Sequence, residues 1–139
     1  MAKRMRKGKS SELIVAGQLI RQEVDIYVPY VDDRGIDLVA RVECPDGIRY
    51  HDLQVKSVRN YNRIIGVKSQ RNHKGSCFMV IHYRHDKKPD EFFYLTKEQV
   101  TQHHKGDSEW GDLIFNKAER AKYSHQTLSE LARILSNCS

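Results

Sequence analysis

Residues 36–57 read IDLVARVECPDGIRYHDLQVKS, which is two strand-like stretches joined by a short polar turn. The β-branched residues and the Pro-Asp-Gly turn predict a β-hairpin. Side chains alternate across a strand, so Gln54 and Lys56 point to one face of this hairpin and Val55 points to the other. Asp37, the acid of the first apolar stretch, can join the polar face. An acid, an amide oxygen and a lysine side by side indicate a metal-and-phosphate site.

Hydrophobic periodicity places other elements around this hairpin. We expect a helix over residues 11–22, capped by Ser10 or Ser11, and a closing helix over residues 125–135. The continuous apolar run at residues 77–83 has the length of a strand and suits the middle of a sheet. Further predicted elements are strands at 24–28, 91–95 and 113–115, a short helix at 96–103, and either a short strand or a loop at 63–68. This order predicts one α/β domain over residues 10–139, with a mixed sheet covered by helices.

The net charge of +6 is unevenly distributed along the 139 residues. Residues 1–9 contain no acid and are expected to form a flexible basic arm, with Lys3, Arg4, Arg6, Lys7 and Lys9. No Asp or Glu occurs from Leu53 to His85, although that window is rich in Lys and Arg. Such segregation predicts a positive surface suited to a polyphosphate partner. The alternative for this window is a solvated surface on which charges of one sign happen to cluster. The alternative for the arm is a disordered solubilising tail.

Several classes of protein lack support in the sequence. No apolar run approaches the ~20 residues of a membrane span, and no signal-peptide stretch follows the basic N-terminus. The three cysteines, Cys44, Cys77 and Cys138, contain no CxxC pair. We therefore predict neither a disulfide framework nor a zinc site, and expect a reducing, cytoplasmic location. No glycine-rich phosphate loop or dinucleotide fingerprint occurs, so no nucleotide cofactor is expected. Since no apolar run is long enough to span a bilayer, no membrane partner is expected either.

The polar residues of the hairpin match the needs of phosphodiester hydrolysis. This reaction requires charge neutralisation on the phosphate, a positioned water and a stabilised leaving oxygen. Magnesium prefers hard oxygen ligands, so Asp37 is the natural primary ligand, with the amide oxygen of Gln54 and the carbonyl of Val55 beside it. Lys56 is the candidate for orienting or deprotonating water. Glu12, in the first turn of the predicted helix, is the candidate second carboxylate.

Each of these residues also has a purely structural interpretation. Glu12 can complement the helix dipole, and Asp37 can cap the turn at Gly35. Gln54 and Lys56 can form the solvent face of an edge hairpin. The functional interpretation is favoured because all four occur in one order along the chain: helix acid, turn, strand acid, and strand Gln-x-Lys.

Three segments together resemble the core of the PD-(D/E)XK nuclease superfamily: SELIVA at 11–16, DDRGIDLV at 32–39 and LQVKS at 53–57. The pattern is most similar to Holliday-junction resolvases and intron-encoded homing endonucleases with a Gln-x-Lys variant motif. The resemblance covers residues 10–58. It implies a restriction-endonuclease-like fold, in which a mixed central β-sheet is flanked by helices.

On this resemblance, Glu12 matches the helix acid, Asp37 the main metal-binding acid and Lys56 the catalytic lysine. Gln54 departs from the usual acid and removes one negative charge from the metal site. Asp52 lies on the same strand face and is an unorthodox candidate to replace that acid.

The resemblance implies a Mg²⁺-dependent DNA endonuclease, with Mn²⁺ as a substitute ion, that acts as a homodimer or higher homo-oligomer. The candidates for gripping the nucleic-acid backbone, besides the arm, are Arg59, Tyr61, Arg63, Lys68, Arg71 and Lys74. The first alternative is a catalytically inactive nucleic-acid-binding protein with the same fold. The second is an accessory domain whose basic charge serves solubility.

Overall fold

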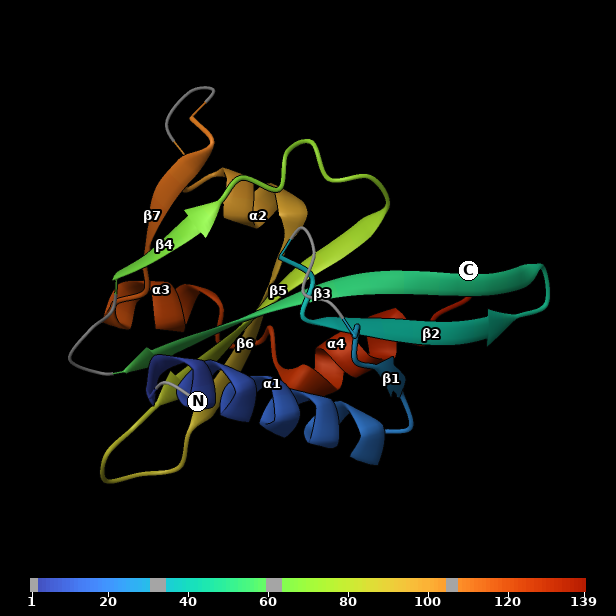
Figure 1. Cartoon of the computed structure of the whole chain (residues 1–139), viewed down its shortest axis with the longest axis horizontal. Helices are drawn as coiled ribbons and strands as arrows, with labels where there is room; N and C mark the ends of the chain where they lie inside the picture. Colours follow the sequence, from blue (N-terminus) through green and yellow to red (C-terminus); the bar gives the residue numbers. More distant parts are fainter. Residues whose placement is uncertain (1–2, 31–34, 60–63, 105–107) are drawn as a thin grey trace.

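A computed structural model of the chain describes residues 3–30, 35–59, 64–104 and 108–139 (Figure 1). In chain order the elements are α1 (Lys3–Arg21), β1 (Asp25–Tyr27), β2 (Leu38–Cys44), β3 (Gly47–Arg59), β4 (Ile64–Lys68), β5 (Ser76–Arg84), β6 (Glu91–Thr96), α2 (Lys97–Thr101), β7 (Trp110–Ile114), α3 (Lys117–Lys122) and α4 (Leu128–Leu135). The predicted α/β class is confirmed.

The central sheet has five strands in the order β1-β2-β3-β5-β6. The predicted hairpin is β2–β3, which pairs antiparallel with Leu38 opposite Leu53. Strand β5 lies parallel on the other side of β3, with Gln54 opposite Met79, and the outer pairs are antiparallel. Strands β4 and β7 form a separate antiparallel ribbon, so the residues predicted as a short strand or a loop form a strand. The sheet is mixed, as predicted.

One face of the sheet, here called the covered face, lies against α1 and α4 (Figure 1). Alternate residues of β2 and β3 point to it, including the buried Leu38 and Leu53. They pack with Val15 and Leu19 of α1 and with Leu131 of α4. The apolar stripe of α4 is therefore core, because its leucines recur at helical spacing. In the described residues, no helix is long and apolar enough to cross a membrane.

The opposite face, here called the cleft face, is only half covered. Over β5 and β6 the β4–β7 ribbon packs onto the sheet, and Val67 and Leu113 join a second buried cluster with Met79 of β5. Over β1, β2 and β3 the same face is open, with Tyr27 and Tyr50 more than half exposed. The ribbon therefore creates an edge halfway across the sheet. Gln54 and Lys56 of β3 lie at this edge.

The first helix begins earlier than predicted. We expected Ser10 or Ser11 to cap it, yet α1 begins at Lys3, so the basic segment enters the helix. Lys, Arg and Met are good helix formers, and the single glycine of the segment, Gly8, does not end the helix. Ser11 is buried inside the helix, where its hydroxyl lies 2.8 Å from Nδ1 of His82 on β5. That residues 1–9 act as an arm separate from the domain stays a prediction.

Helix α3 was not predicted. It has no buried residue, so its sequence lacks the apolar stripe that identifies a short helix. It is stabilised instead by its cap, because the side chain of Asn116 accepts a hydrogen bond from the backbone of Glu119.

The prediction that the cysteines form no disulfide is wrong. Cys44, at the end of β2, is bonded to Cys138, which follows α4, across a sequence separation of 94 residues. Cys44 continues the alternation of Leu38, so it faces the same side as α4. Spacing along the sequence gave no sign of this pair, because the packing of α4 brings the two ends together. Cys77 is the free cysteine of the described residues and is buried.

Candidate active site

Asp37 immediately precedes β2. At this point β3 extends beyond the start of β2, so its further residues have no strand opposite them on that side. The backbone N–H of Asp37 donates to the carbonyl of Leu53 at 2.9 Å, which is the last step of the hairpin ladder. Two residues after Leu53 along β3, the N–H of Val55 faces the same side but has no residue of β2 opposite it. The carboxylate of Asp37 accepts it at 2.7 Å. A side chain thus replaces the missing strand neighbour, which fixes the carboxylate against the edge of β3.

The carbonyl of Val55 points to this same edge. In an extended strand the N–H and C=O of one residue project to the same side, and the N–H of Val55 meets Asp37. The Val55 side chain packs against the covered-face core. Val55 therefore anchors the strand on one face while its main chain reaches the carboxylate of Asp37.

A glycine allows the chain to approach the site closely. Gly35 has φ of +73°, in the left-handed region that favours glycine. A Cβ built on it would lie 3.3 Å from Nε2 of Gln54. The turn before Asp37 therefore passes tightly over the Gln54 amide, and any side chain at this position would strain both the backbone and that contact.

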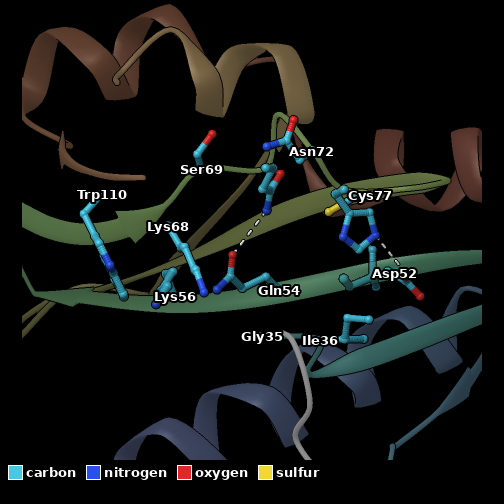
Figure 2. Close-up of a pocket in the computed structure, with 13 residues that line it drawn as sticks. Gly35, Ile36, Asp52, Gln54, Lys56, Lys68, Ser69, Asn72, Cys77 and Trp110 are labelled. Atoms are coloured by element: carbon cyan, nitrogen blue, oxygen red, sulfur yellow. Dashed lines mark hydrogen bonds and ion pairs between the residues drawn. The ribbon is translucent and has the colours of Figure 1, made fainter. Parts of the chain in front are cut away.

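Gln54 and Lys56 share one cavity, as their spacing predicted (Figure 2). The cavity has a volume of about 520 Å³ and lies between β3, the β4–β7 ribbon and the connection from β4 to β5. Its described lining consists of Gly35, Ile36, Asp52, Leu53, Gln54, Lys56, Lys68, Ser69, Gln70, Asn72, His73, Cys77 and Trp110. Asp37 follows directly on two of these residues. Asp37 itself is not among the described lining residues, but its carboxylate is bonded to the N–H of Val55, between Gln54 and Lys56 on β3.

Sequence reasoning missed Gln70, which holds the Gln54 side chain. Its Nε2 donates to Oε1 of Gln54 at 3.2 Å, and its side chain is 6% exposed. Oε1 of Gln70 is buried and has no hydrogen-bond partner in the described structure. A buried polar atom without a partner is costly, so this oxygen suits a water or a cation. No sequence signal marks Gln70, because it lies in a polar connection with no motif.

Asp52 is engaged in holding the rim of the cavity. His73 donates from Nε2 to the carboxylate of Asp52 at 2.9 Å. The ammonium of Lys97 donates to the backbone carbonyls of His73 and Gly75. The β4–β5 connection is thereby tied to β3 and α2. This pairing gives Asp52 a structural role. That Asp52 replaces the missing acid as a metal ligand stays a prediction.

Glu12 lies on α1, the helix that packs on the covered face. Its carboxylate pairs with the ammonium of Lys9 at 2.8 Å, and its side chain is 17% exposed. Glu12 is not among the described residues that line the cavity. The structure therefore does not bring it to Gln54 and Lys56 directly, and its role as a second carboxylate stays a prediction.

The candidate backbone-binding residues are dispersed. Lys68 lines the cavity, while Arg71 and Lys74 are exposed on the β4–β5 connection, and Arg59 ends β3 half-buried. Tyr61 and Arg63 lie outside the described residues. The basic residues at the N-terminus are part of α1, namely Lys3, Arg4, Arg6, Lys7 and Lys9.

The candidate donors at this site are oxygens. They are the carboxylate of Asp37, the carbonyl of Val55 and the amide oxygens of Gln54 and Gln70. Such hard donors fit Mg²⁺, although the described residues contain no group of three or more His, Cys, Asp or Glu able to hold a metal ion. Burial raises the pKa of the Cys77 thiol to about 11, so this cysteine stays protonated and is a poor nucleophile.

The sheet order and the flanking helices are those of the restriction-endonuclease-like fold. Among the solved structures that resemble the chain are two nucleases. A bacterial homing endonuclease, I-Ssp6803I, matches with a TM-score of 0.60 and 16% identity over 96% of this chain and 94% of its own. The Holliday junction resolvase Hjc of Archaeoglobus fulgidus, an archaeal hyperthermophile, matches with a TM-score of 0.53 and 12% identity over 91% and 96%.

The two neighbours confirm the fold that the sequence motifs predicted, and at these identities the likeness concerns the fold. No protein-family model matches the sequence. A search of curated proteins also finds no match. The chemistry of this chain must therefore be argued from its own residues.

Proposed function

We propose that this protein is a metal-dependent endonuclease that hydrolyses DNA phosphodiester bonds. The observation that carries the proposal is the hydrogen bond of the Asp37 carboxylate to the N–H of Val55, which lies on β3 between the two cavity-lining residues Gln54 and Lys56. The fold shared with a homing endonuclease and a Holliday junction resolvase supports it.

The ligands proposed for Mg²⁺, or for Mn²⁺ in its place, are Asp37, Val55 and Gln54, with Glu12 as a further carboxylate. When bound, the ion neutralises phosphate charge and makes a coordinated water a better nucleophile at neutral pH. Gln54 contributes no negative charge, so the ion binds more weakly than it would beside an acid. Gln70 donates to one lone pair of the Gln54 oxygen and holds the amide in one orientation, which leaves the second lone pair of that oxygen for the ion.

Lys56 supplies the chain's own cationic group at the reacting phosphate. Its ammonium has three donors, which can orient the attacking water and stabilise charge that develops on the phosphate oxygens. Lys68 lines the same cavity from the ribbon, where its ammonium pairs with the exposed Glu109 at 3.1 Å, so it adds to the attraction of Lys56 only when a phosphate displaces that carboxylate. Arg71 and Lys74 on the exposed connection are suited to neighbouring phosphates, where such contacts position DNA without reading its sequence.

We further propose that the working form is a homodimer. The domain offers one candidate site, whereas a DNA duplex has two strands to cut. Two copies related by a twofold axis place one site on each strand. An intact duplex substrate that is cut on both strands by an enzyme shown to be monomeric would contradict this part of the proposal.

A catalytically inactive nucleic-acid-binding protein is the second candidate. Gln54 in place of an acid favours it, as does the lack of a metal-binding acidic group in the described residues. This alternative predicts tight, salt-dependent DNA binding without turnover that depends on a divalent ion.

The test is cleavage of a panel of branched and linear DNA by the wild-type protein, Asp37→Asn and Asp37→Ala, with and without Mg²⁺. Asparagine keeps an oxygen that can accept from the Val55 N–H, whereas alanine removes it. We expect both variants to lose about 1,000-fold in rate, since metal charge stabilisation is worth several kcal/mol. Alanine alone should also lower the free energy of unfolding. Cleavage by Asp37→Asn at the wild-type rate refutes the assignment.

A further inference from the structure

Trp110 is the only tryptophan of the chain, and it faces the cavity rather than the core. Along β7 the side chains alternate, so Leu113 is buried while Trp110 and Ile114 are 60% and 48% exposed. A single exposed apolar residue is ordinary. Trp110 differs from Ile114 because its ring lines the cavity that holds Gln54 and Lys56, and Ile114 is not among the described lining residues.

The ribbon holds Trp110 and Lys68 together as one wall of the cavity. The two residues are directly opposite across β4 and β7. Figure 2 shows both side chains extending from the ribbon towards Lys56 on β3. The backbone here is fixed, since Ser69 donates to the carbonyl of Glu109 at 2.7 Å and the Ser108 hydroxyl donates to that of Trp110 at 2.7 Å.

The surroundings of the indole suit a nucleotide better than an apolar partner. Lys56 provides positive charge for a phosphate. Lys68 provides a second ammonium, which pairs with the exposed carboxylate of Glu109 at 3.1 Å, and an exposed pair of this kind is weak enough for a phosphate to displace. Ser69, Gln70 and Asn72 provide polar groups along the rim. Among the described aromatic rings, none is in contact with the ring of Trp110. A positive groove beside an accessible aromatic ring is the combination that binds single-stranded nucleic acid.

We infer that Trp110 stacks on an unpaired base of the DNA, next to the phosphate held by Lys56 and Lys68. This inference rests on the proposed function. Inside an intact duplex both faces of a base are stacked on their neighbours, so the indole can reach a base only where a nucleotide has left the stack. The preferred substrate is then DNA with an unpaired nucleotide beside the bond that is cut.

The test uses Trp110 as its own probe. The full-length Asp37→Asn protein is titrated without Mg²⁺ with a fully paired duplex and with the same duplex carrying one unpaired nucleotide. Stacking on a base quenches indole fluorescence, so we expect clear quenching by the second duplex and little by the first. Equal quenching, or none with either duplex that binds, overturns the inference.

Binding of labelled DNA by variants in the Asp37→Asn background gives an independent measure. Trp110→Ala is expected to weaken binding of the duplex with the unpaired nucleotide about 10-fold, which lies within the range for loss of one stacked base. Trp110→Phe keeps a ring and should restore most of the affinity. Ile114→Ala is the matched control on the same strand face and should bind like its parent, with all three variants melting at the same temperature. Parental affinity in Trp110→Ala overturns the inference.

Cleavage by the wild-type protein separates this inference from the proposed function. If the wild type cuts DNA and Trp110→Ala binds as its parent does, the stacking role fails and the nuclease stands. If Trp110 is quenched selectively and nothing is cut, the nuclease proposal fails and the stacking role stands. If neither duplex binds at all, both are wrong.

Discussion

The two faces of the central sheet differ in what their side chains contact, although the same strands form both. On the covered face, Leu38 and Leu53 pack with α1 and α4 into an apolar core. On the cleft face, residues one position away along β3 line an open cavity, namely Gln54 and Lys56. Because side chains alternate along a strand, core residues and candidate site residues are separated by a single residue step.

Val55 joins the two faces. Its side chain belongs to the covered-face core, while its main-chain N–H meets the carboxylate of Asp37. The candidate metal-binding edge is therefore held rigidly by the packing beneath it. The comparison teaches that damage to the covered face should cost stability first, whereas damage to the cleft face should cost function with little loss of stability.

The largest expected effect on stability concerns the disulfide that joins β2 to the end of the chain on the covered face. The disulfide between Cys44 and Cys138 closes a long loop of the unfolded chain. Its removal by reduction, or in Cys44→Ser, should lower the free energy of unfolding by about 4.7 kcal/mol on the chain-entropy account. Urea denaturation with and without a reductant measures this. Both cysteines lie away from the described cavity lining, so DNA cleavage below the transition should persist in reductant. Unchanged stability after full reduction would contradict the prediction.

The next effect contrasts one residue from each face. Leu131→Ala empties part of the covered-face core and should lower the free energy of unfolding by about 3 kcal/mol, while the folded fraction keeps its cleavage rate. Lys56→Met removes the cavity ammonium and should lower the cleavage rate about 100-fold, with stability nearly unchanged. Urea titration and single-turnover cleavage of each variant measure the two effects. If both variants lose the same property, the division between the faces is wrong.

The smallest expected effect concerns a contact within the cleft face, the hydrogen bond from Gln70 to Gln54. Gln70→Leu leaves the Gln54 amide without its donor, so we expect the cleavage rate to fall about 10-fold at limiting Mg²⁺, as is typical when a residue supporting a metal ligand is lost. The Mg²⁺ concentration for half-maximal cleavage should rise, and excess Mg²⁺ should recover most of the rate.

The matched control for Gln70 is Gln126, another buried glutamine, which donates to the carbonyl of Tyr94. Gln126→Leu should lower stability and leave the Mg²⁺ requirement unchanged. A similar shift of the Mg²⁺ requirement in both variants would assign Gln70 a merely structural role.

The sequence by itself determined the hairpin, the shared face of Gln54 and Lys56, and the apolar stripe of α4. Each of these follows from local periodicity, since strand alternation and helical spacing are set by the backbone. The motif order also placed Asp37 beside the hairpin, where the structure has it bonded to Val55.

Only the tertiary structure decided the contact of Gln70 with Gln54, the exposure of Trp110, the pairing of Cys44 with Cys138 and the packing of the Glu12 helix on the covered face. These depend on segments far apart in the chain that carry no shared local pattern. The β4–β7 ribbon, for example, packs onto half of one sheet face through residues from several elements. The free energy of such packing is summed over the whole core, so no short stretch of sequence predicts it.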